Sequence, residues 1–208
     1  MIYIFDMDGT LVDSNEVIHN GIGPYFLANG IEYTSDVKQR TIASGYLDTA
    51  KFMVNDYGVN KPVDTVCEEL KSITTKAYEE FIPAKPYAGD LVNRLKNEGH
   101  RLFILSASPQ TMIVPCLKRL KMIDCFETIW STEDFGYSKD NTELYIDVAK
   151  KLSVRINECI VIDDSIVPVR TAKKAGAIVY AVYDKTSEIF KEEMKKIADR
   201  YLNDLSEF

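Results

Sequence analysis

From residue 84 onward, the chain alternates short apolar runs with segments of helical periodicity. Runs such as RLFIL are too short for helices, whereas between them apolar residues recur every three or four positions. Strands that alternate with helices form a parallel sheet with right-handed crossovers. The pattern predicts strands over residues 101–105, 127–130, 159–162 and 177–182, and helices around Leu91 and over 109–121, 141–152 and 167–175.

The first part of the chain shows one strand followed only by helices. Residues 2–5 (IYIF) predict a buried strand, which must join the same sheet because a lone strand leaves its backbone groups unsatisfied. Helical patterns follow over about 14–29, 34–42, 47–57 and 63–81, and Pro83 and Pro86 then break the pattern. We therefore expect an α/β fold, a doubly wound parallel sheet built from residues 1–14 and 84–208. Residues 15–83 would form an α-helical cap domain inserted after the first strand.

The C-terminal tail fits more than one structure. Apolar residues between Ile189 and Leu205 have the spacing of one or two amphipathic helices, and the pattern leaves open a short final strand near Tyr201.

Charge and cysteine content narrow the class of protein. A net charge of -7 argues against nucleic acid as a main partner, although a bound cation would still allow an anionic substrate. The N-terminus has no basic leader and no run reaches the length of a membrane span, so we expect a cytoplasmic protein. We separately expect a monomer or a weak homodimer. The cysteines have no metal-site spacing and are predicted to be buried free thiols: Cys67, Cys116, Cys125 and Cys159.

Polar side chains follow the predicted strands where each one ends. Asp6 and Asp8 follow the first strand, Ser106 the second, and Asp163 with Asp164 the strand over 159–162, while a basic residue, Lys139, comes shortly after residues 127–130. The carboxyl ends of parallel strands meet at one edge of the sheet, where ligands bind. Carboxylates gathered there repel each other unless a cation lies among them, and Mg²⁺ prefers oxygen ligands. The pattern thus predicts a magnesium site for phosphoryl transfer, in which Ser106 and Lys139 contact phosphate oxygens.

The two acids of the first loop can divide the chemical work. Asp6, fixed at the strand end, is the better candidate for a nucleophile that attacks phosphorus. Asp8 could protonate the leaving oxygen and then deprotonate water, and Gly9 permits the turn that directs it.

Each of these features alone has a simpler structural interpretation. Asp-Gly after a strand is common in turns, Ser106 and the Asp163-Asp164 pair could cap helices, and Lys139 could be a solvated loop charge. Their joint occurrence, each past a separate strand, favours a site.

These motifs resemble those of the haloacid dehalogenase-like (HAD) hydrolase superfamily. FDMDGTLVDS resembles its first motif, RLFILSAS its second, the lysine of YSKDNTEL its third and CIVIDDS its fourth. The resemblance covers residues 1–15 and 84–185 and implies that residues 16–82 are a helical cap. It implies that Asp6 is the nucleophile and a Mg²⁺ ligand, and that Asp8 is the acid and base and offers its backbone carbonyl to the metal. Asp164, with Asp163 directly or through water, would complete the metal site, and a carboxylate at Asp8 makes dehalogenation an unexpected activity.

Within the superfamily, the chain is most similar to the β-phosphoglucomutase and phosphoglycolate phosphatase group. Two departures favour a phosphatase that acts on a small phosphate monoester. Asp48 stands where mutases of this group carry a cap-loop Arg, and Ile18, with His19 next to it, stands where they carry a His. A third departure, Lys139-Asp140 in place of Lys-Pro, puts the loop conformation in question. The alternatives are a sugar phosphomutase and, from another class, a non-catalytic phospho-acceptor or regulatory binding module.

The cap loop and the second motif are expected to contact the substrate, a small phosphorylated metabolite. The residues expected there are Gly45, Tyr46, Asp48, Ala107 and Ser108, although a plain turn between helices would also explain residues 44–48. His19 either lines the cap entrance or packs within its helix. Aromatic residues at helical spacing are expected in the cap core: Tyr25, Phe26, Phe52 and Tyr57.

Overall fold

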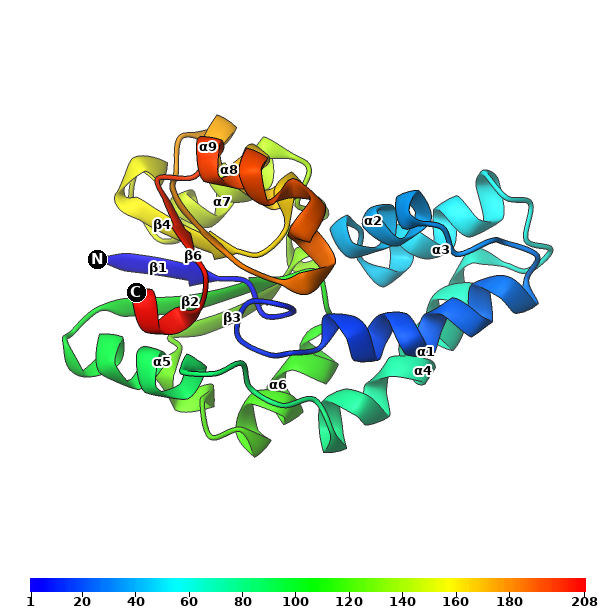
Figure 1. Ribbon diagram of the computed structural model, residues 1–208, viewed down its shortest axis with the longest axis horizontal. Helices are drawn as coiled ribbons and strands as arrows, with labels where there is room; N and C mark the ends of the chain where they lie inside the picture. Colours follow the sequence, from blue (N-terminus) through cyan, green and yellow to red (C-terminus); the bar gives the residue numbers. More distant parts are fainter.

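A parallel sheet of six strands, in the order β3-β2-β1-β4-β5-β6, forms the centre of the molecule (Figure 1). The computed structural model describes residues 1–208, except for the side chains of Gln39, Ile42 and Ala43. The strands are β1 (Ile2–Phe5), β2 (Arg101–Ser106), β3 (Thr128–Ser131), β4 (Cys159–Asp163), β5 (Ile178–Val182) and β6 (Arg200–Leu202). The first strand therefore lies in the middle of the sheet, as the predicted doubly wound fold requires.

The apolar run of β1 is explained by burial on both faces. Tyr3 and Phe5 belong to one hydrophobic cluster, whereas Ile2 and Ile4 belong to the other, because successive side chains of a strand point to opposite faces. Helices α5 (Ala88–Asn97) and α6 (Gln110–Arg119) contribute to the first cluster. Helices α7 (Thr142–Lys151), α8 (Ile166–Ala175) and α9 (Lys191–Ile197) contribute to the second. The result is a three-layer α/β core, so the predicted fold class is confirmed.

The tail contains both elements that its pattern left open. A short helix, α9, is followed by β6, which pairs with β5 in parallel. Met194 of α9 is fully buried, so the apolar spacing of the tail reflects packing against the core.

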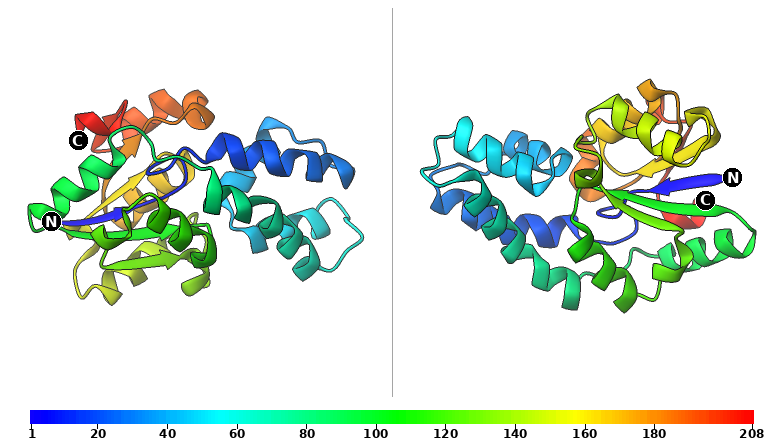
Figure 2. Two further views of the ribbon diagram at one scale, coloured as in Figure 1. Left: turned by 90° about the horizontal axis from the view of Figure 1, so that it is seen from below. Right: turned by 180° about the vertical axis from the view of Figure 1, so that it is seen from behind.

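Helices α1 to α4 form a separate lobe beside the sheet, seen from three directions in Figures 1 and 2. They are α1 (Asn15–Ala28), α2 (Ser35–Ala43), α3 (Tyr46–Asn55) and α4 (Val63–Glu80), all between β1 and β2 in the chain. We call residues 15–80 the helical lobe. It has its own apolar cluster, which includes Phe26 and Phe52. The prediction that Tyr57 lies in the core of this lobe is wrong, because Tyr57 lies beyond the end of α3 and is 47% exposed.

Two neighbouring segments connect the lobe to the core. The backbone N–H of Asp13 donates to Pro83 O over 2.9 Å, and that of Lys85 donates to Leu11 O over 2.9 Å. Helix α4 also packs against α6, so the lobe rests on the core as well as being connected to it. The division into a core of residues 1–14 and 84–208 and a mobile cap of residues 15–83 stays a prediction.

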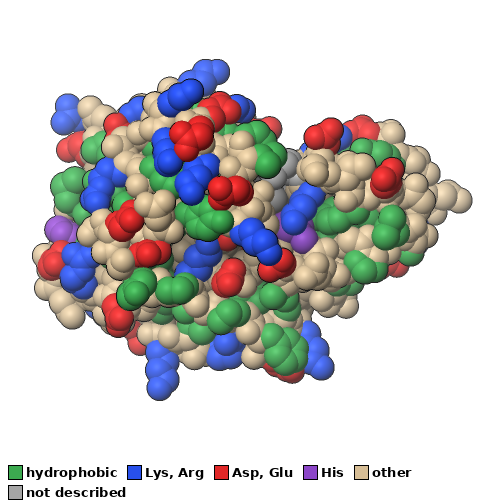
Figure 3. All heavy atoms as spheres, viewed as in Figure 1, with side chains coloured by type: hydrophobic (Ala, Val, Ile, Leu, Met, Phe, Trp, Pro, Cys, Tyr) green, Lys and Arg blue, Asp and Glu red, His purple; other side chains and the backbone are tan. Residues whose placement is uncertain are grey.

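The remaining features to compare with the sequence are the surface charge, the absence of a membrane-spanning helix among the described residues, and the state of the cysteines. Acidic and basic side chains are interspersed on the face seen in Figure 3. Among the described residues, none of the helices combines the length and the apolar character that a membrane span needs. All four cysteines are buried free thiols, as predicted.

Candidate active site

Three carboxylates meet where β1 and β4 end, at the point where the strand order reverses. Asp6 directly follows β1, and its backbone N–H donates to Ile162 O over 2.8 Å, so the sheet holds its position. Asp163 is the last residue of β4 and Asp164 follows it. One carboxylate oxygen from each of the three lies within 4.8 Å of the others, and all three side chains are buried. The predicted convergence of these acids at one edge of the sheet is therefore present.

Lys139 lies among these acids rather than in solvent. Its Nζ donates to Asp6 Oδ1 over 2.5 Å and to Asp163 Oδ2 over 2.7 Å. Burial disfavours the charged form of this lysine, but Asp163 and Asp6 outweigh burial and raise its pKa. Lys139 is therefore a fixed positive charge, and the cluster of three carboxylates and one ammonium keeps an excess of negative charge.

Burial and mutual repulsion raise the pKa values of two of these acids. Burial, only partly offset by Lys139 and reinforced by Asp163, raises the pKa of Asp6 to about 7. Burial, together with repulsion from Asp163 and Asp6, raises the pKa of Asp164 well above its usual range. A divalent cation removes this repulsion, and an all-carboxylate donor set is one that Mg²⁺ accepts. The residues present fit the predicted metal, with Asp6, Asp163 and Asp164 as the side chains that would hold it.

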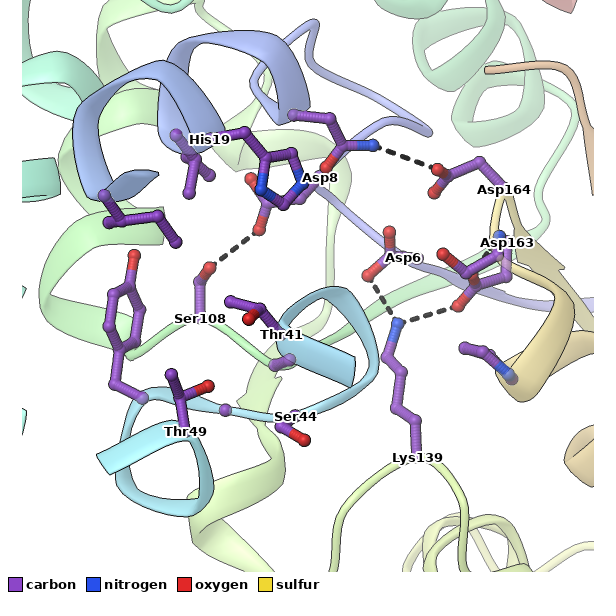
Figure 4. Close-up of a pocket in the computed structure, with 18 of the residues that line it drawn as sticks. Asp6, Asp8, His19, Thr41, Ser44, Thr49, Ser108, Lys139, Asp163 and Asp164 are labelled. Carbon is purple, nitrogen blue, oxygen red and sulfur yellow. Dashed lines mark hydrogen bonds and ion pairs between the residues drawn. The ribbon is translucent and has the colours of Figure 1, made fainter. Parts of the chain in front are cut away.

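Asp8 faces a group of hydroxyls instead of the other acids. Its Oδ1 accepts from Ser14 Oγ and from the Tyr78 hydroxyl, each over 2.6 Å. Its Oδ2 accepts from Ser108 Oγ over 2.7 Å and more weakly from Ser106 Oγ over 3.4 Å. The carboxylate is thereby held at the edge of the cavity, on the side of the helical lobe (Figure 4).

The turn that directly follows Asp8 requires glycine. Gly9 has a φ of +82°, and a Cβ built on it would lie 2.3 Å from Asp164 Oδ2. Both the backbone conformation and the close approach to Asp164 exclude a side chain at this position.

Asp164 has partners that the sequence pattern did not reveal. Asn15 Nδ2 donates to Asp164 Oδ2 over 3.1 Å, and Thr10 Oγ1 donates to Asp164 Oδ1 over 3.2 Å. Asn15 also reaches Asp184 Oδ1 over 3.3 Å, and Lys85 Nζ lies 2.6 Å from Asp184 Oδ2. Asn15 and Lys85 stand at the two connections between core and lobe, so both connections are joined to the acid cluster. A polar residue at the start of a helix signals a cap in the sequence, and this is why Asn15 was missed.

A cavity of about 80 Å³ lies between the acids and the helical lobe. Four of the five residues predicted to contact substrate line it: Gly45, Tyr46, Ala107 and Ser108. Gly45 comes especially close to the core, because a Cβ there would lie 3.3 Å from Ala107 O. Ser106 does not line the cavity but supports it, accepting from Ser108 N over 3.0 Å.

The structure does not bring Asp48 to this cavity. Its carboxylate pairs with Lys51 over 2.8 Å, and the residue borders two other depressions, each lined by residues of both the lobe and the core. Asp48 lies in the first turn of α3, which turns its side chain away while Gly45 and Tyr46 face the acids. The role predicted for Asp48 thus has no support from the geometry. His19, by contrast, is buried and lines the cavity.

The sequence pattern of the family described as haloacid dehalogenase-like hydrolase matches residues 3–182. The chain belongs to this family. A curated relative, hexitol phosphatase B of Escherichia coli (strain K12), is 28% identical over 78% of this chain and 74% of its own length. A bifunctional riboflavin kinase/FMN phosphatase of Arabidopsis thaliana is 25% identical over 86% of this chain, which spans only 47% of that protein. The predicted family resemblance is confirmed.

A solved structure shows the same fold as this chain. The β-phosphoglucomutase of Clostridium difficile superposes with a TM-score of 0.84 at 18% identity, over 100% of this chain and 93% of the other. At this identity the likeness concerns the fold alone, so the reaction has to be argued from the site.

Proposed function

We propose that this family member is a Mg²⁺-dependent phosphatase that hydrolyses a small phosphate monoester through an aspartyl phosphate on Asp6. The observation that carries the proposal is the geometry around Asp6. A buried carboxylate, fixed by the sheet, lies 2.5 Å from a permanent positive charge and next to two more acids that suit a metal. A second acid, Asp8, faces the same cavity from its other side.

The first half of the reaction forms the covalent intermediate. A carboxylate oxygen of Asp6 attacks phosphorus, and the bond between phosphorus and the ester oxygen breaks as the new bond forms. Asp8, in its acid form, gives its proton to the leaving oxygen, so that an alcohol departs.

The second half returns the enzyme to its starting state. The Asp8 carboxylate accepts a proton from a water molecule, whose oxygen attacks phosphorus and displaces the Asp6 carboxylate. Inorganic phosphate leaves, and Asp8 is again protonated. Lys139 supports both halves because its ammonium group lies where phosphoryl oxygens would gather beside Asp6. Asp6, Asp163 and Asp164, together with the backbone carbonyl of Asp8, would hold Mg²⁺. When bound, the ion would neutralise phosphoryl charge.

The lining of the cavity supports a role for the helical lobe in enclosing the substrate. Cavity-lining residues come from α1, α2, α3 and α4 as well as from the core. A lobe that closes over the acids would exclude bulk water from the intermediate. A phospho-acceptor module would instead have to expose its acid to a partner protein, which the buried Asp6 does not favour.

Release of inorganic phosphate from a panel of monoesters tests the proposal. With Mg²⁺ the wild-type protein should release phosphate, a chelator should abolish release, and added Mg²⁺ should restore it. Asp6→Asn should lower the rate by at least about three orders of magnitude. Asp13→Asn, at an exposed acid a few residues along the same loop, serves as the matched control and should keep the rate. Equal rates for the wild type and Asp6→Asn would refute the role of Asp6.

A further inference from the structure

The lobe side of the cavity carries no cation among the described residues. It offers apolar surface from Ile18, Ile22 and Leu70. Its polar groups belong to His19, Thr41, Ser44, Tyr46 and Thr49. The three side chains that are not described, Gln39, Ile42 and Ala43, are of uncharged types. The lobe thus presents a neutral surface opposite the acids.

The cations of the wider site are already engaged or lie elsewhere. Lys139, the one cation that lines the described cavity, donates to Asp6 and Asp163. Arg40 borders a neighbouring depression and pairs with Asp56 over 2.6 Å. Lys38 does not line the cavity but borders another depression together with Lys85, and its charge reaches His19. A second anionic group on a substrate would therefore face carboxylates on one side and no opposite charge on the other.

His19 does not supply the missing charge. It is 6% exposed, and its Nδ1 lies 2.6 Å from the Tyr33 hydroxyl. Burial, reinforced by Lys38 and opposed by Asp184, lowers the pKa of its ring to about 3. The neutral ring keeps one nitrogen, Nε2, without a protein partner among the described residues. It can exchange one hydrogen bond with a hydroxyl but cannot neutralise an anion.

Like His19 Nε2, two hydroxyls of the lobe are available for hydrogen bonds to a ligand. Neither Ser44 nor Thr49 has a side-chain hydrogen-bond partner in the described part of the chain, and both line the cavity. In contrast, the Tyr46 hydroxyl is bound to Thr74 Oγ1 over 2.7 Å, and Thr41 Oγ1 donates to Val37 O over 2.8 Å. The free polar groups are thus neutral donors and acceptors set among aliphatic walls.

We propose, building on the phosphatase function proposed above, that the substrate carries a single phosphate on an otherwise uncharged, hydroxylated carbon chain, which His19, Ser44 and Thr49 recognise. Apolar walls contact its C–H groups, and the neutral polar groups bind its hydroxyls. Bisphosphates and phosphorylated carboxylic acids are disfavoured as substrates. The same feature argues against a sugar phosphomutase, which has to hold a second phosphate away from the acids.

Pairs of substrates that differ only in one charge test this inference. Glycerol 3-phosphate and 3-phosphoglycerate differ at one terminus by CH₂OH against carboxylate, and sorbitol 6-phosphate and 6-phosphogluconate form the corresponding six-carbon pair. We expect the neutral member of at least one pair to be preferred at least about tenfold in kcat/KM. Calorimetric titration of the inactive Asp6→Asn variant should show the same preference in Kd, which gives a measure independent of turnover.

A variant and its matched control locate the source of the preference. Ser44→Lys places a cation in the cavity and should reduce the preference several-fold, mainly by improving binding of the charged member. Ser72→Lys adds the same charge at an exposed position of α4 outside the cavity and should leave the preference unchanged.

The outcomes separate this inference from the proposed phosphatase activity. Hydrolysis of p-nitrophenyl phosphate without any preference for the neutral members overturns the inference and leaves the phosphatase activity standing. No hydrolysis of any ester overturns the phosphatase activity, and the Kd values then decide the inference alone. Equal or tighter binding of the charged members, or no binding of either neutral member, would overturn it.

Discussion

The Tyr78 hydroxyl donates to Asp8 over 2.6 Å and lies 2.8 Å from Ser108 Oγ. Tyr78 belongs to α4 of the helical lobe, whereas Asp8 and Ser108 belong to the core. Burial and the negative charge of Asp8 raise the pKa of Tyr78 well above its usual range, so the hydroxyl stays protonated and acts as a donor. The proposed acid and base is therefore held in place by a residue of the lobe.

Replacing Tyr78 with Phe should weaken both stability and catalysis. The substitution removes a buried hydrogen bond to a carboxylate, which we expect to lower the free energy of unfolding by about 1.5–3 kcal/mol. Because Asp8 is then less well oriented, kcat should fall by roughly ten- to a hundredfold. Urea denaturation and steady-state kinetics measure the two effects.

Tyr57→Phe is the control for this substitution. Tyr57 is in the same lobe but is 47% exposed, so the loss of its hydroxyl should change neither quantity noticeably. If Tyr78→Phe behaved like Tyr57→Phe, the contact with Asp8 would have no role in positioning.

Removal of Lys139 should expose the repulsion among the acids. In Lys139→Met the buried Asp6 and Asp163 lose their shared cation, and we expect the metal-free protein to lose about 3–5 kcal/mol of stability at neutral pH. Added Mg²⁺ should recover part of this loss because it binds the folded carboxylates. Chemical denaturation with a chelator and then with Mg²⁺ measures both values.

An exposed ion pair provides the comparison for Lys139. Lys173 pairs with Asp199 over 2.6 Å, but both side chains are 39% exposed. Lys173→Met should therefore cost less than about 1 kcal/mol and show no dependence on Mg²⁺. Equal losses for the two variants would mean that the Lys139 contacts do not compensate buried charge.

His19 should make the fold sensitive to acid. Burial, with Lys38 reinforcing and Asp184 opposing, lowers the pKa of its ring to about 3, against about 6.5 in an unfolded chain. Below about pH 6.5 the unfolded chain binds a proton that the folded chain does not. The contribution of neutral His19 to the free energy of unfolding is thus complete above that pH and is lost as the pH falls toward 3. The loss by about pH 5 is about 2 kcal/mol.

The two histidines of the chain provide a matched test of this pH dependence. His19→Gln keeps a group that can bind Tyr33 but cannot titrate, so the part of the acid sensitivity due to His19 should disappear. His100→Gln, which replaces the other histidine outside the cavity, is the comparison variant for the loss of an imidazole. An unchanged profile in His19→Gln would show that His19 is not held neutral by the fold. Denaturation curves recorded between about pH 4.5 and 7.5 measure the pH dependence of the free energy of unfolding.

The acids could be predicted from the sequence because their positions follow from local pattern. An apolar run that ends in Asp6 must place that carboxylate at a strand end, and parallel strands bring Asp163 and Asp164 to the same edge. Lys139 could be placed near them because it follows the strand over residues 127–130 at the same edge, and the family motif then supports that placement. The central place of β1 follows from its burial on both faces, which an unbroken apolar run indicates.

The lobe residues could not be placed in the same way. Whether a helix residue faces the cavity depends on how each helix packs, so the apolar spacing of α4 did not single out Tyr78. Asp48, in a loop expected to face the site, instead pairs with Lys51 in the first turn of α3 and does not line the cavity. Asn15 was hidden by its resemblance to a helix cap, although its side chain spans Asp164 and Asp184.

The most direct test of the account is to trap a phosphoryl group on Asp6. In Asp8→Asn, p-nitrophenyl phosphate can still phosphorylate Asp6, since its leaving group needs no proton, but no base remains to activate water. After mixing with Mg²⁺ and quenching in acid, we predict a burst of about one nitrophenol per protein and a phosphorylated peptide containing Asp6. The double variant Asp6→Asn with Asp8→Asn should give neither. A phosphoryl group on another residue, or steady nitrophenol release with no phosphorylated protein, would contradict the account.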